Sequence, residues 1–362
     1  MKIGMAILAL VGAVGTASAA NIGDIIYTDL THNDVALVPG LGGSVSTLID
    51  FAGSLGSNGT RMGGIVQVGN NFYVANGPVG IPNPSDSAIW EISGLLSGTP
   101  TVANFAFGDP VQNPTDIEYD AQADALVWIQ NPFGPVAQGA QDGIYGQKFS
   151  GGGVVQGFAE PAVTGATPRY EAGTYMTRNP IGSGYYNVAL NGGFLPSGPN
   201  PASDNVSPST LWKTTIDPNT LTASLTLAFD FGSLATDLTQ VRGITAIPGQ
   251  QALYVTEWLE GKVYRVDLNA NGDVLGLAEI ASGFDHPEAI EWNPITNKLV
   301  ISEEANKNVP NQKISQINVD GSGYQVLVAQ THARGFAFVV PTPGAASLAG
   351  LAGLVVLRRR RA

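Results

Sequence analysis

The chain has 362 residues, with 17 lysines and arginines against 29 acidic residues, a formal net charge of −12 and no cysteine. A protein this acidic repels phosphate backbones and anionic lipid, so nucleic-acid binding is excluded as its main function. The 46 glycines and 23 prolines, with only 13% charged residues, indicate a turn-rich all-β protein with a polar, weakly charged surface and no disulfide to stabilise it.

The first nineteen residues have the pattern of a secretory signal peptide. Lys2 precedes a short apolar stretch, and Ala17-Ser18-Ala19 provides the small residues of a cleavage site at Ala17 and Ala19. We expect the export machinery to remove residues 1–19 and the mature chain to lie outside the cytoplasm. Residues 20–340 then form the folded body.

The segment from Val241 to Gly272 shows most clearly how this body is organised. A short apolar strand at 243–247 ends at a Pro-Gly turn, a β-branched and aromatic run follows at 252–257, and 262–268 alternates in period two. The pattern predicts an antiparallel four-stranded sheet with no helical periodicity. One such sheet leaves both faces uncovered, so further copies are needed to bury them.

Six copies of the opening strand occur along the chain, 46 to 71 residues apart, which is the spacing of four-stranded propeller blades with insertions. Their first residues are Gly64, Asp116, Ala172, Gly243, Ala289 and Gly335. The last opening strand, 335–340, has no second strand after it, and the second strand at 25–28 has no opening strand before it. We therefore predict an all-β, six-bladed β-propeller whose ring is closed by one blade built from the N- and C-terminal strands, which removes the free sheet edges.

At the level of motifs, the chain resembles six-bladed propellers of the YWTD, NHL and gluconolactonase-like group. The residues that carry the resemblance are Ile26 to Asp29, Leu253 to Glu257, His286 to Ile290 and Lys313 to Gly321. The repeat covers most of the mature chain, and the resemblance implies the fold more than any one activity.

In such a propeller, the residues just before each opening strand lie at the mouth of the central channel. These positions hold Arg61, Thr115, Glu171, Arg242, Glu288 and Arg334, with Asp116 and His286 nearby. We take Arg242, Glu288, Arg334, Glu171 and Asp116 as the candidate ligand-binding residues. We also expect Glu288 and Glu291, on one strand, to face the same side, where they hold a metal or share a proton, unless Arg242 or Arg334 pairs with Glu288.

Carboxylate and amide side chains also recur at the ends of the second strands, where their oxygens suit a hard cation such as Ca²⁺. With Glu288, they give the candidate metal ligands Asp29, Asn76, Asn191, Glu257, Glu288 and Glu303. The competing interpretation is structural, because an acid at a strand end commonly accepts hydrogen bonds from backbone N–H groups of its own or the next blade.

Residues 341–362 form a separate C-terminal segment. It contains Pro341-Thr342-Pro343, a Gly/Ala/Leu-rich stretch of fourteen residues and a final cluster of Arg358, Arg359, Arg360 and Arg361. The stretch is shorter than the ~20 residues that span a bilayer as a helix. The three parts resemble the PEP-CTERM class of bacterial sorting signals, with Pro-Thr-Pro in place of Pro-Glu-Pro. The resemblance implies an exosortase-like enzyme as partner, delivery to the cell envelope and transient membrane anchoring; a short uncleaved anchor is the alternative.

Two functions follow from these observations. The first is a non-enzymatic, envelope-sorted propeller that binds an envelope protein or glycan, because the chain has no convincing nucleophile or base. The alternative is a Ca²⁺-dependent lactonase-like hydrolase, in which Glu288, Asn76, Asn191 and Asp29 hold the ion. Arg242 departs from that second pattern, which has an asparagine there. The sequence favours the first function.

Overall fold

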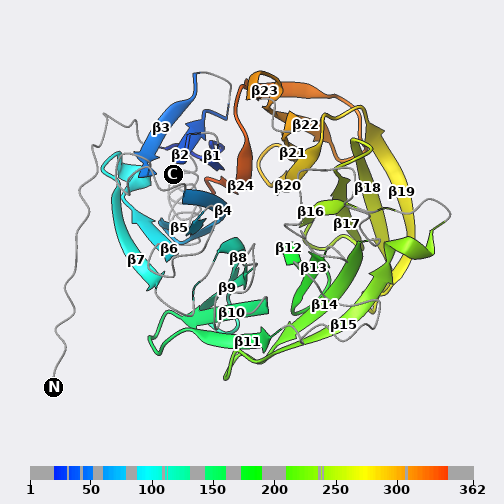
Figure 1. The fold of residues 1–362 in the computed structure, drawn as a ribbon, viewed down its shortest axis with the longest axis horizontal. Helices are drawn as coiled ribbons and strands as arrows, with labels where there is room; N and C mark the ends of the chain where they lie inside the picture. The colour runs from blue at the N-terminus through cyan, green and yellow to red at the C-terminus, as the bar shows by residue number, and fades with distance from the viewer. Residues whose placement is uncertain are drawn as a thin grey trace, which may run out of the picture.

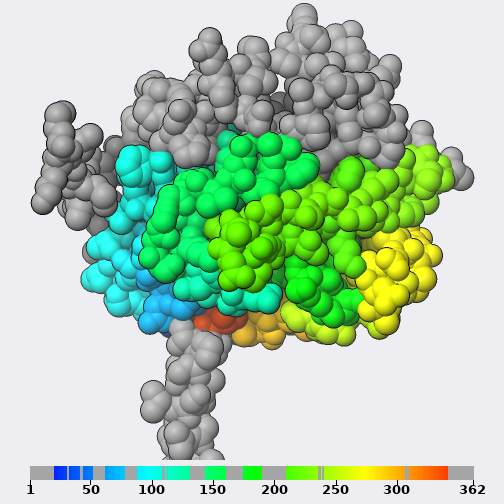
Figure 2. Space-filling model, turned by 90° about the horizontal axis from the view of Figure 1, so that it is seen from below, coloured from blue at the N-terminus to red at the C-terminus, as the bar shows by residue number. Residues whose placement is uncertain are grey.

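Six four-stranded antiparallel sheets surround a common axis in the computed structural model of the chain (Figure 1). The structure describes residues 20–30, 32–40, 44–51, 60–78, 88–107, 111, 113–130, 143–159, 173–189, 209–234, 238, 240–305 and 309–340. The predicted signal peptide and C-terminal sorting signal lie outside these residues. Seen from the side, the described strands form a flat disc (Figure 2).

The blades follow one another in chain order, each written from its innermost to its outermost strand. The first blade consists of β24 (Ala333–Phe338), β1 (Ile25–Asp29), β2 (Asp34–Val38) and β3 (Ser46–Asp50). The second consists of β4 (Thr60–Val68), β5 (Asn71–Pro78), β6 (Ala88–Ser93) and β7 (Thr101–Phe107). The third consists of β8 (Pro114–Asp120), β9 (Ala125–Gln130), β10 (Gly143–Lys148) and β11 (Val155–Ala159). The others are β12 (Gly173–Arg178), β13 (Tyr185–Ala189), β14 (Thr210–Ile216) and β15 (Ala223–Asp230); β16 (Val241–Ala246), β17 (Ala252–Glu257), β18 (Lys262–Leu268) and β19 (Val274–Ser282); and β20 (Pro287–Asn293), β21 (Lys298–Glu303), β22 (Lys313–Asn318) and β23 (Gln325–Ala329).

Short 3₁₀ turns at Leu95–Ser97, Phe231–Ser233 and Val309–Asn311 complete the secondary structure of the described residues. No helix among them has the length and hydropathy needed to cross a membrane.

The ring closes as the sequence predicts. Strand β1 pairs antiparallel with β24, and Ile25 lies opposite Phe338 in the register. Two further backbone hydrogen bonds extend the closure: Gly23 donates to the Val339 carbonyl, and Val339 donates to the Asp24 carbonyl. The six-bladed prediction and the joint terminal blade are therefore confirmed.

Burial explains why the strands of one blade differ in composition. Strands β1, β9, β13 and β17 are second in their blades and are buried along their whole length, because neighbouring blades cover both of their faces. The outermost strands, such as β15 and β19, are mostly half-buried or exposed. Continuous apolar runs therefore mark the second strands, as expected for a sheet that is covered on both sides.

The two faces of the disc carry different connections. We call the face at which the innermost strands begin the mouth face, and the opposite one the turn face. Short turns such as Asn269–Asp273 connect strands at the turn face. The two ends of the described chain also lie there, because Ala20 donates to the Leu95 carbonyl and Val340 is bonded to Gln67.

Candidate functional site

Every innermost strand carries a β-bulge close to its first residue, at the mouth face. The register shifts lie between Met62 and Ile65 in β4, Pro114 and Asp116 in β8, Gly173 and Tyr175 in β12, Val241 and Ile244 in β16, Pro287 and Ile290 in β20, and Ala333 and Gly335 in β24. A bulge bends its strand and re-aims the side chains beside it. The side chains at this level therefore turn toward the channel mouth and toward the next blade.

Glycine at the bulge allows neighbouring blades to approach one another. A Cβ atom on Gly243 would collide with the Glu288 carbonyl oxygen of the next blade. The Thr256 hydroxyl on β17 links Gly243 on β16 to Glu288 on β20. It accepts from the Gly243 N–H and donates to the Glu288 carbonyl, both at 2.8 Å. These contacts hold the backbone around Glu288 in place independently of the contacts that its side chain makes.

Glu288 is the centre of a buried ionic group at the mouth, with 1% of its surface exposed. Its Oε1 lies 2.5 Å from Arg334 Nη1 and 3.3 Å from Arg242 Nη1, and its Oε2 lies 2.6 Å from His332 Nε2. Arg242 Nη1 also lies 3.2 Å from Glu304 Oε2. We call these five residues, Arg242, Glu288, Glu304, His332 and Arg334, the mouth cluster.

The mouth cluster is charged and nearly balanced. Burial by itself would raise the pKa of Glu288, but Arg334, His332 and Arg242 together hold that pKa well below its usual value. In the same way, the Glu288 carboxylate raises the pKa of Arg334 although burial opposes it. The Glu288 carboxylate and the Arg334 guanidinium therefore carry their charges at neutral pH.

An outer layer of contacts holds the Arg242 guanidinium in place. It stacks over the Trp258 ring, 4.2 Å from the centroid, and its Nη2 donates to Gln240 at 2.9 Å. Trp258 in turn donates from its Nε1 to Glu304 and contacts the His286 ring at 4.3 Å between centroids. The stacking and the hydrogen bonds leave Arg242 little freedom to move aside for a ligand.

The predicted acids at the strand ends bind neighbouring donors. Asp29 accepts hydrogen bonds from the His32 N–H and the Thr331 hydroxyl. Glu257 accepts from the N–H groups of Gln240 and Glu260. These contacts agree with the structural interpretation of the strand-end acids.

Glu303 follows the same rule, since it accepts from the Asp285 N–H, the Ser315 hydroxyl and the Tyr324 hydroxyl. Asn76 differs, because its buried amide makes no hydrogen bond among the described residues. Asn191 and Glu171 lie outside the described residues.

The residues present do not fit a calcium ion at the mouth. Glu288, Glu304 and His332 bring three ligand atoms within 4.8 Å of one another, and within the described part of the chain they are the one group that does so. However, two guanidinium groups already lie on Glu288, and one of them also lies on Glu304. A divalent cation placed there would meet two buried positive charges at close range, which is unfavourable.

The expected pairing of Glu288 with an arginine is found, and both candidate arginines take part in it. Glu288 and Glu291, for which a shared metal or proton was the other expectation, have different partners in the structure. They are three residues apart, and only the bulge between Pro287 and Ile290 lets both turn toward the channel. Glu288 joins the mouth cluster, whereas Glu291 lies deeper and accepts from the Thr245 hydroxyl at 2.9 Å.

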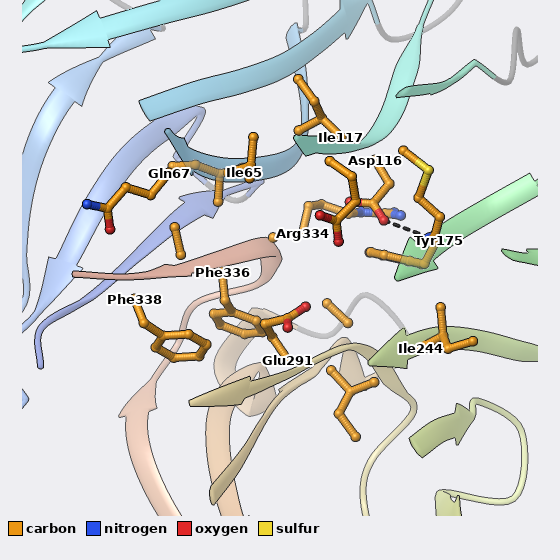
Figure 3. Close-up of a pocket in the computed structure, with 17 residues that line it drawn as sticks. Ile65, Gln67, Asp116, Ile117, Tyr175, Ile244, Glu291, Arg334, Phe336 and Phe338 are labelled. Carbon is orange, nitrogen blue, oxygen red and sulfur yellow. Dashed lines mark hydrogen bonds between the residues drawn. The ribbon is translucent and has the colours of Figure 1, made fainter. Parts of the chain in front are cut away.

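Below the mouth cluster, the channel contains a cavity of about 150 Å³, which we call the channel pocket (Figure 3). It extends from Tyr175 and Arg334 to Gln67 and Phe338, near the turn face. Apolar side chains form much of its wall, including Ile65, Ile117, Ile244, Met176, Phe336 and Phe338.

Three acids line the same pocket: Asp116 and Glu118 from β8, and Glu291 from β20; we call them the acidic trio. Burial raises the pKa of Asp116 and Glu291 well above the usual value, and Glu118 adds to both effects. Burial also raises the pKa of Glu118, to about 7, although Arg178 opposes this. Asp116 Oδ2 accepts the Met176 N–H at 2.8 Å, so Asp116 also joins β8 to β12.

The sequence identified Asp116 but missed Glu118, Glu304, His332 and Tyr175 as members of these two groups. Glu118 has a signal, because it is two residues from Asp116 on one strand and therefore faces the same side. Glu304 and His332 lie just outside strands, where only the folded connections bring them to Glu288.

No model of a protein family matches the sequence, and neither does any curated protein. Among solved structures, a chain of a nidogen/laminin complex superposes with a TM-score of 0.61 at 12% identity, covering 88% of this chain and 98% of that one. A protein from Lactobacillus plantarum superposes with a TM-score of 0.53 at 11% identity, covering 88% of this chain and 100% of that one. Identities this low establish similarity of fold alone.

Proposed function

We propose that the chain is an exported β-propeller that acts at the cell envelope as a non-enzymatic binding module. The observation that carries the proposal is the state of Glu288, which two arginines and a histidine already hold. A carboxylate so committed serves to fix three innermost strands together at the mouth rather than to bind and activate water. One of the two similar folds belongs to a nidogen/laminin complex, which supports binding as a use of this architecture.

The mouth face is the surface that we assign to the partner. Leu259, in the connection after β17, is 51% exposed at this face, next to Trp258. The described chain ends on the opposite face, where Val340 accepts from and donates to Gln67. A tail that anchors the chain through residues 341–362 would therefore direct the turn face toward the membrane and leave the mouth face free for an envelope protein or glycan.

The proposal is tested by a matched pair of surface variants. Leu259→Asp changes the mouth face, and Ile295→Asp changes the turn after β20 on the turn face, where Ile295 is 46% exposed. If an envelope component binds the mouth face, its retention on the immobilised protein falls with Leu259→Asp and stays unchanged with Ile295→Asp. Equal retention by both variants would contradict the assignment of the face.

Catalysis is tested separately on a panel of lactones and esters. We expect no turnover above background, with or without added Ca²⁺. Turnover that EDTA and Glu288→Gln both abolish would overturn the proposal and establish the Ca²⁺-dependent lactonase-like alternative. Export is tested by locating the chain in cell fractions with and without residues 341–362, and retention of the mature chain in the cytoplasm would contradict it.

A further inference from the structure

The channel pocket is lined by three acids for which the described side chains supply no ion-pair partner. None of the ion pairs between described side chains joins a lysine or arginine to Asp116, Glu118 or Glu291, although Arg178 lowers the pKa of Glu118. The one guanidinium that lines the pocket belongs to Arg334, and its Nη1 lies on Glu288. A cation that enters the pocket would therefore lie among acids that have no ion-pair partner of their own.

The same wall contains a buried hydroxyl whose contacts fall short of a good hydrogen bond. Tyr175 is 6% exposed and lines the pocket, and its hydroxyl makes no hydrogen bond of normal geometry with the described residues. Burial, Glu288 and Asp116 raise the pKa of Tyr175, and the Arg334 guanidinium, which is in contact with its hydroxyl, opposes this. A buried hydroxyl without a hydrogen bond is destabilising, so its oxygen is available to an N–H donor that reaches the inner end of the pocket.

The arrangement suits an organic cation better than a metal ion. The trio does not bring three ligand atoms within 4.8 Å of one another, which a single ion in contact with all three would require. The pocket of about 150 Å³ exceeds the ~30 Å³ that a water molecule occupies. Its apolar wall would receive methylene groups, while the acids would receive the N–H groups of a cationic head.

We propose that the channel pocket binds a small primary alkylammonium group, with its head among Asp116, Glu118 and Glu291 and its alkyl chain against Phe336 and Ile244. The head lies between these acids and donates to the carboxylate nearest to it and to the Tyr175 hydroxyl oxygen, since the trio does not bring three acceptor atoms within 4.8 Å of one another. The source is a free amine or the side chain of a lysine. This inference does not depend on an envelope location or on the partner of the mouth face.

The acids also predict how binding depends on pH. Burial raises the pKa of Glu118 and Arg178 on β12 opposes this, while Glu118 itself raises the pKa of Asp116 on its own strand and of Glu291 across the channel. The Glu118 pKa of about 7 means that this acid is mostly neutral at pH 6 and mostly charged at pH 8. An alkylammonium ion keeps its charge over this range. Affinity should therefore rise about tenfold from pH 6 to pH 8, with release of protons from the pocket.

The test compares n-butylamine with n-butanol by calorimetric titration of the full chain. We expect saturable binding of n-butylamine in roughly the millimolar range, with n-butanol at least about tenfold weaker. Equal binding of the two compounds would show an apolar cavity alone and would overturn the proposal, as would no saturable binding of the amine. Saturable Ca²⁺ binding in the pocket without amine binding would also overturn it. This comparison needs no variant, so it does not depend on the folding of a mutant.

Variants then locate the site. Glu118→Gln and Glu291→Gln should each weaken n-butylamine binding about tenfold, whereas Glu279→Gln, on the outermost strand β19, should bind as the native chain does. Loss of binding in Glu279→Gln, or unchanged binding in both pocket variants, would overturn the assignment. Nα-acetyl-lysine amide distinguishes the two sources: binding places a lysine side chain in the pocket, and no binding restricts the site to free amines.

Discussion

Glu288 and Glu291 lie three residues apart on the same strand, yet their surroundings differ completely. Glu288, in the mouth cluster, has two arginines and a histidine on its carboxylate, and its pKa is lowered. Glu291, in the channel pocket, has a threonine hydroxyl and two other acids nearby, and its pKa is raised. Burial acts on both in the same direction. The charges that neighbouring blades contribute at each level of the channel therefore decide whether the pKa of the acid is raised or lowered.

This difference separates structural from functional use of buried acids. The mouth cluster balances its charges internally, so it ties β16, β20 and β24 together at the mouth. No described cation forms an ion pair with the acidic trio, and Arg178 opposes the effect of burial on Glu118 alone, so the pKa of each of the three acids is raised. An arrangement that is unfavourable for folding but open to a cation is typical of a binding site rather than of a structural support.

The largest expected effect comes from Glu288→Gln. The change leaves the guanidinium groups of Arg242 and Arg334 without their shared carboxylate, and losing one partner of a buried ion pair costs about 3–5 kcal/mol. We expect a loss of about 3 kcal/mol in the free energy of unfolding by urea at pH 7. Glu279→Gln, an exposed carboxylate on β19, is the control and should change the free energy by less than about 0.5 kcal/mol.

A loss below about 1 kcal/mol for Glu288→Gln would mean that the arginines find other partners. The pH dependence offers a second check. The folded pKa of Glu288 is lowered, so its contribution to stability is complete above its usual pKa of 4.5 and is lost as the pH falls toward the folded value. The native chain should lose stability below about pH 4.5 more steeply than Glu288→Gln does.

The next effect comes from Gly243→Ala. The added methyl group would meet the Glu288 carbonyl oxygen and force β16 away from β20, so we expect a loss of about 2 kcal/mol. Gly276→Ala on β19 is the matched control, because no atom lies within 4 Å of its added Cβ and the change should be neutral or slightly stabilising. Urea unfolding compares the two. Equal stabilities would contradict the close contact between the blades.

For Glu118→Gln we expect a smaller change in the free energy of unfolding, and a gain rather than a loss. Its folded pKa is raised to about 7, so its ionisation destabilises the fold as the pH rises from about 4.5 to 7. The linkage limit for such a shift is about 3 kcal/mol, and because the side chain is only partly shielded from solvent we expect a gain of about 1 kcal/mol.

The measurement is the difference in melting temperature between Glu118→Gln and the native chain at pH 5 and at pH 8. The variant should melt higher at pH 8 and about equally at pH 5. A stabilisation that is the same at both values would mean that ionisation of Glu118 is not its cause.

The fold could be predicted from the sequence because the same pattern of strands and turns recurs in each blade. The strands at 25–28 and 335–340, each of which lacks its neighbour in the repeat, were enough to predict the closing blade. The pairing of Arg242 and Arg334 with Glu288 was one of the expected alternatives, because all three precede opening strands. The separation of Glu288 from Glu291 depends on a bulge, which periodicity alone does not locate.

The residues that form the mouth cluster and the channel pocket could not be predicted to the same extent as the fold. His332 and Glu304 reach the mouth cluster from connections between strands, so no strand pattern places them. The sequence pattern indicates a core aromatic at Tyr175, and only the structure shows that its hydroxyl makes no hydrogen bond of normal geometry with the described residues and lies beside Arg334. Contacts between residues far apart in sequence decide which buried polar groups are satisfied.

The smallest effect on stability is expected for Tyr175→Phe, which removes the unpaired hydroxyl and keeps the ring. No hydrogen bond of normal geometry is lost among the described residues, so the free energy of unfolding should change by less than about 0.5 kcal/mol. The affinity for n-butylamine should nevertheless fall several-fold, because the ammonium group loses one acceptor. Tyr254→Phe is the control, since its hydroxyl bonds Gln250 on the turn face, away from the pocket. A large loss of stability in Tyr175→Phe would show that the hydroxyl has a partner, and unchanged affinity for n-butylamine would remove Tyr175 from the site while leaving the acidic trio to be judged by its own variants.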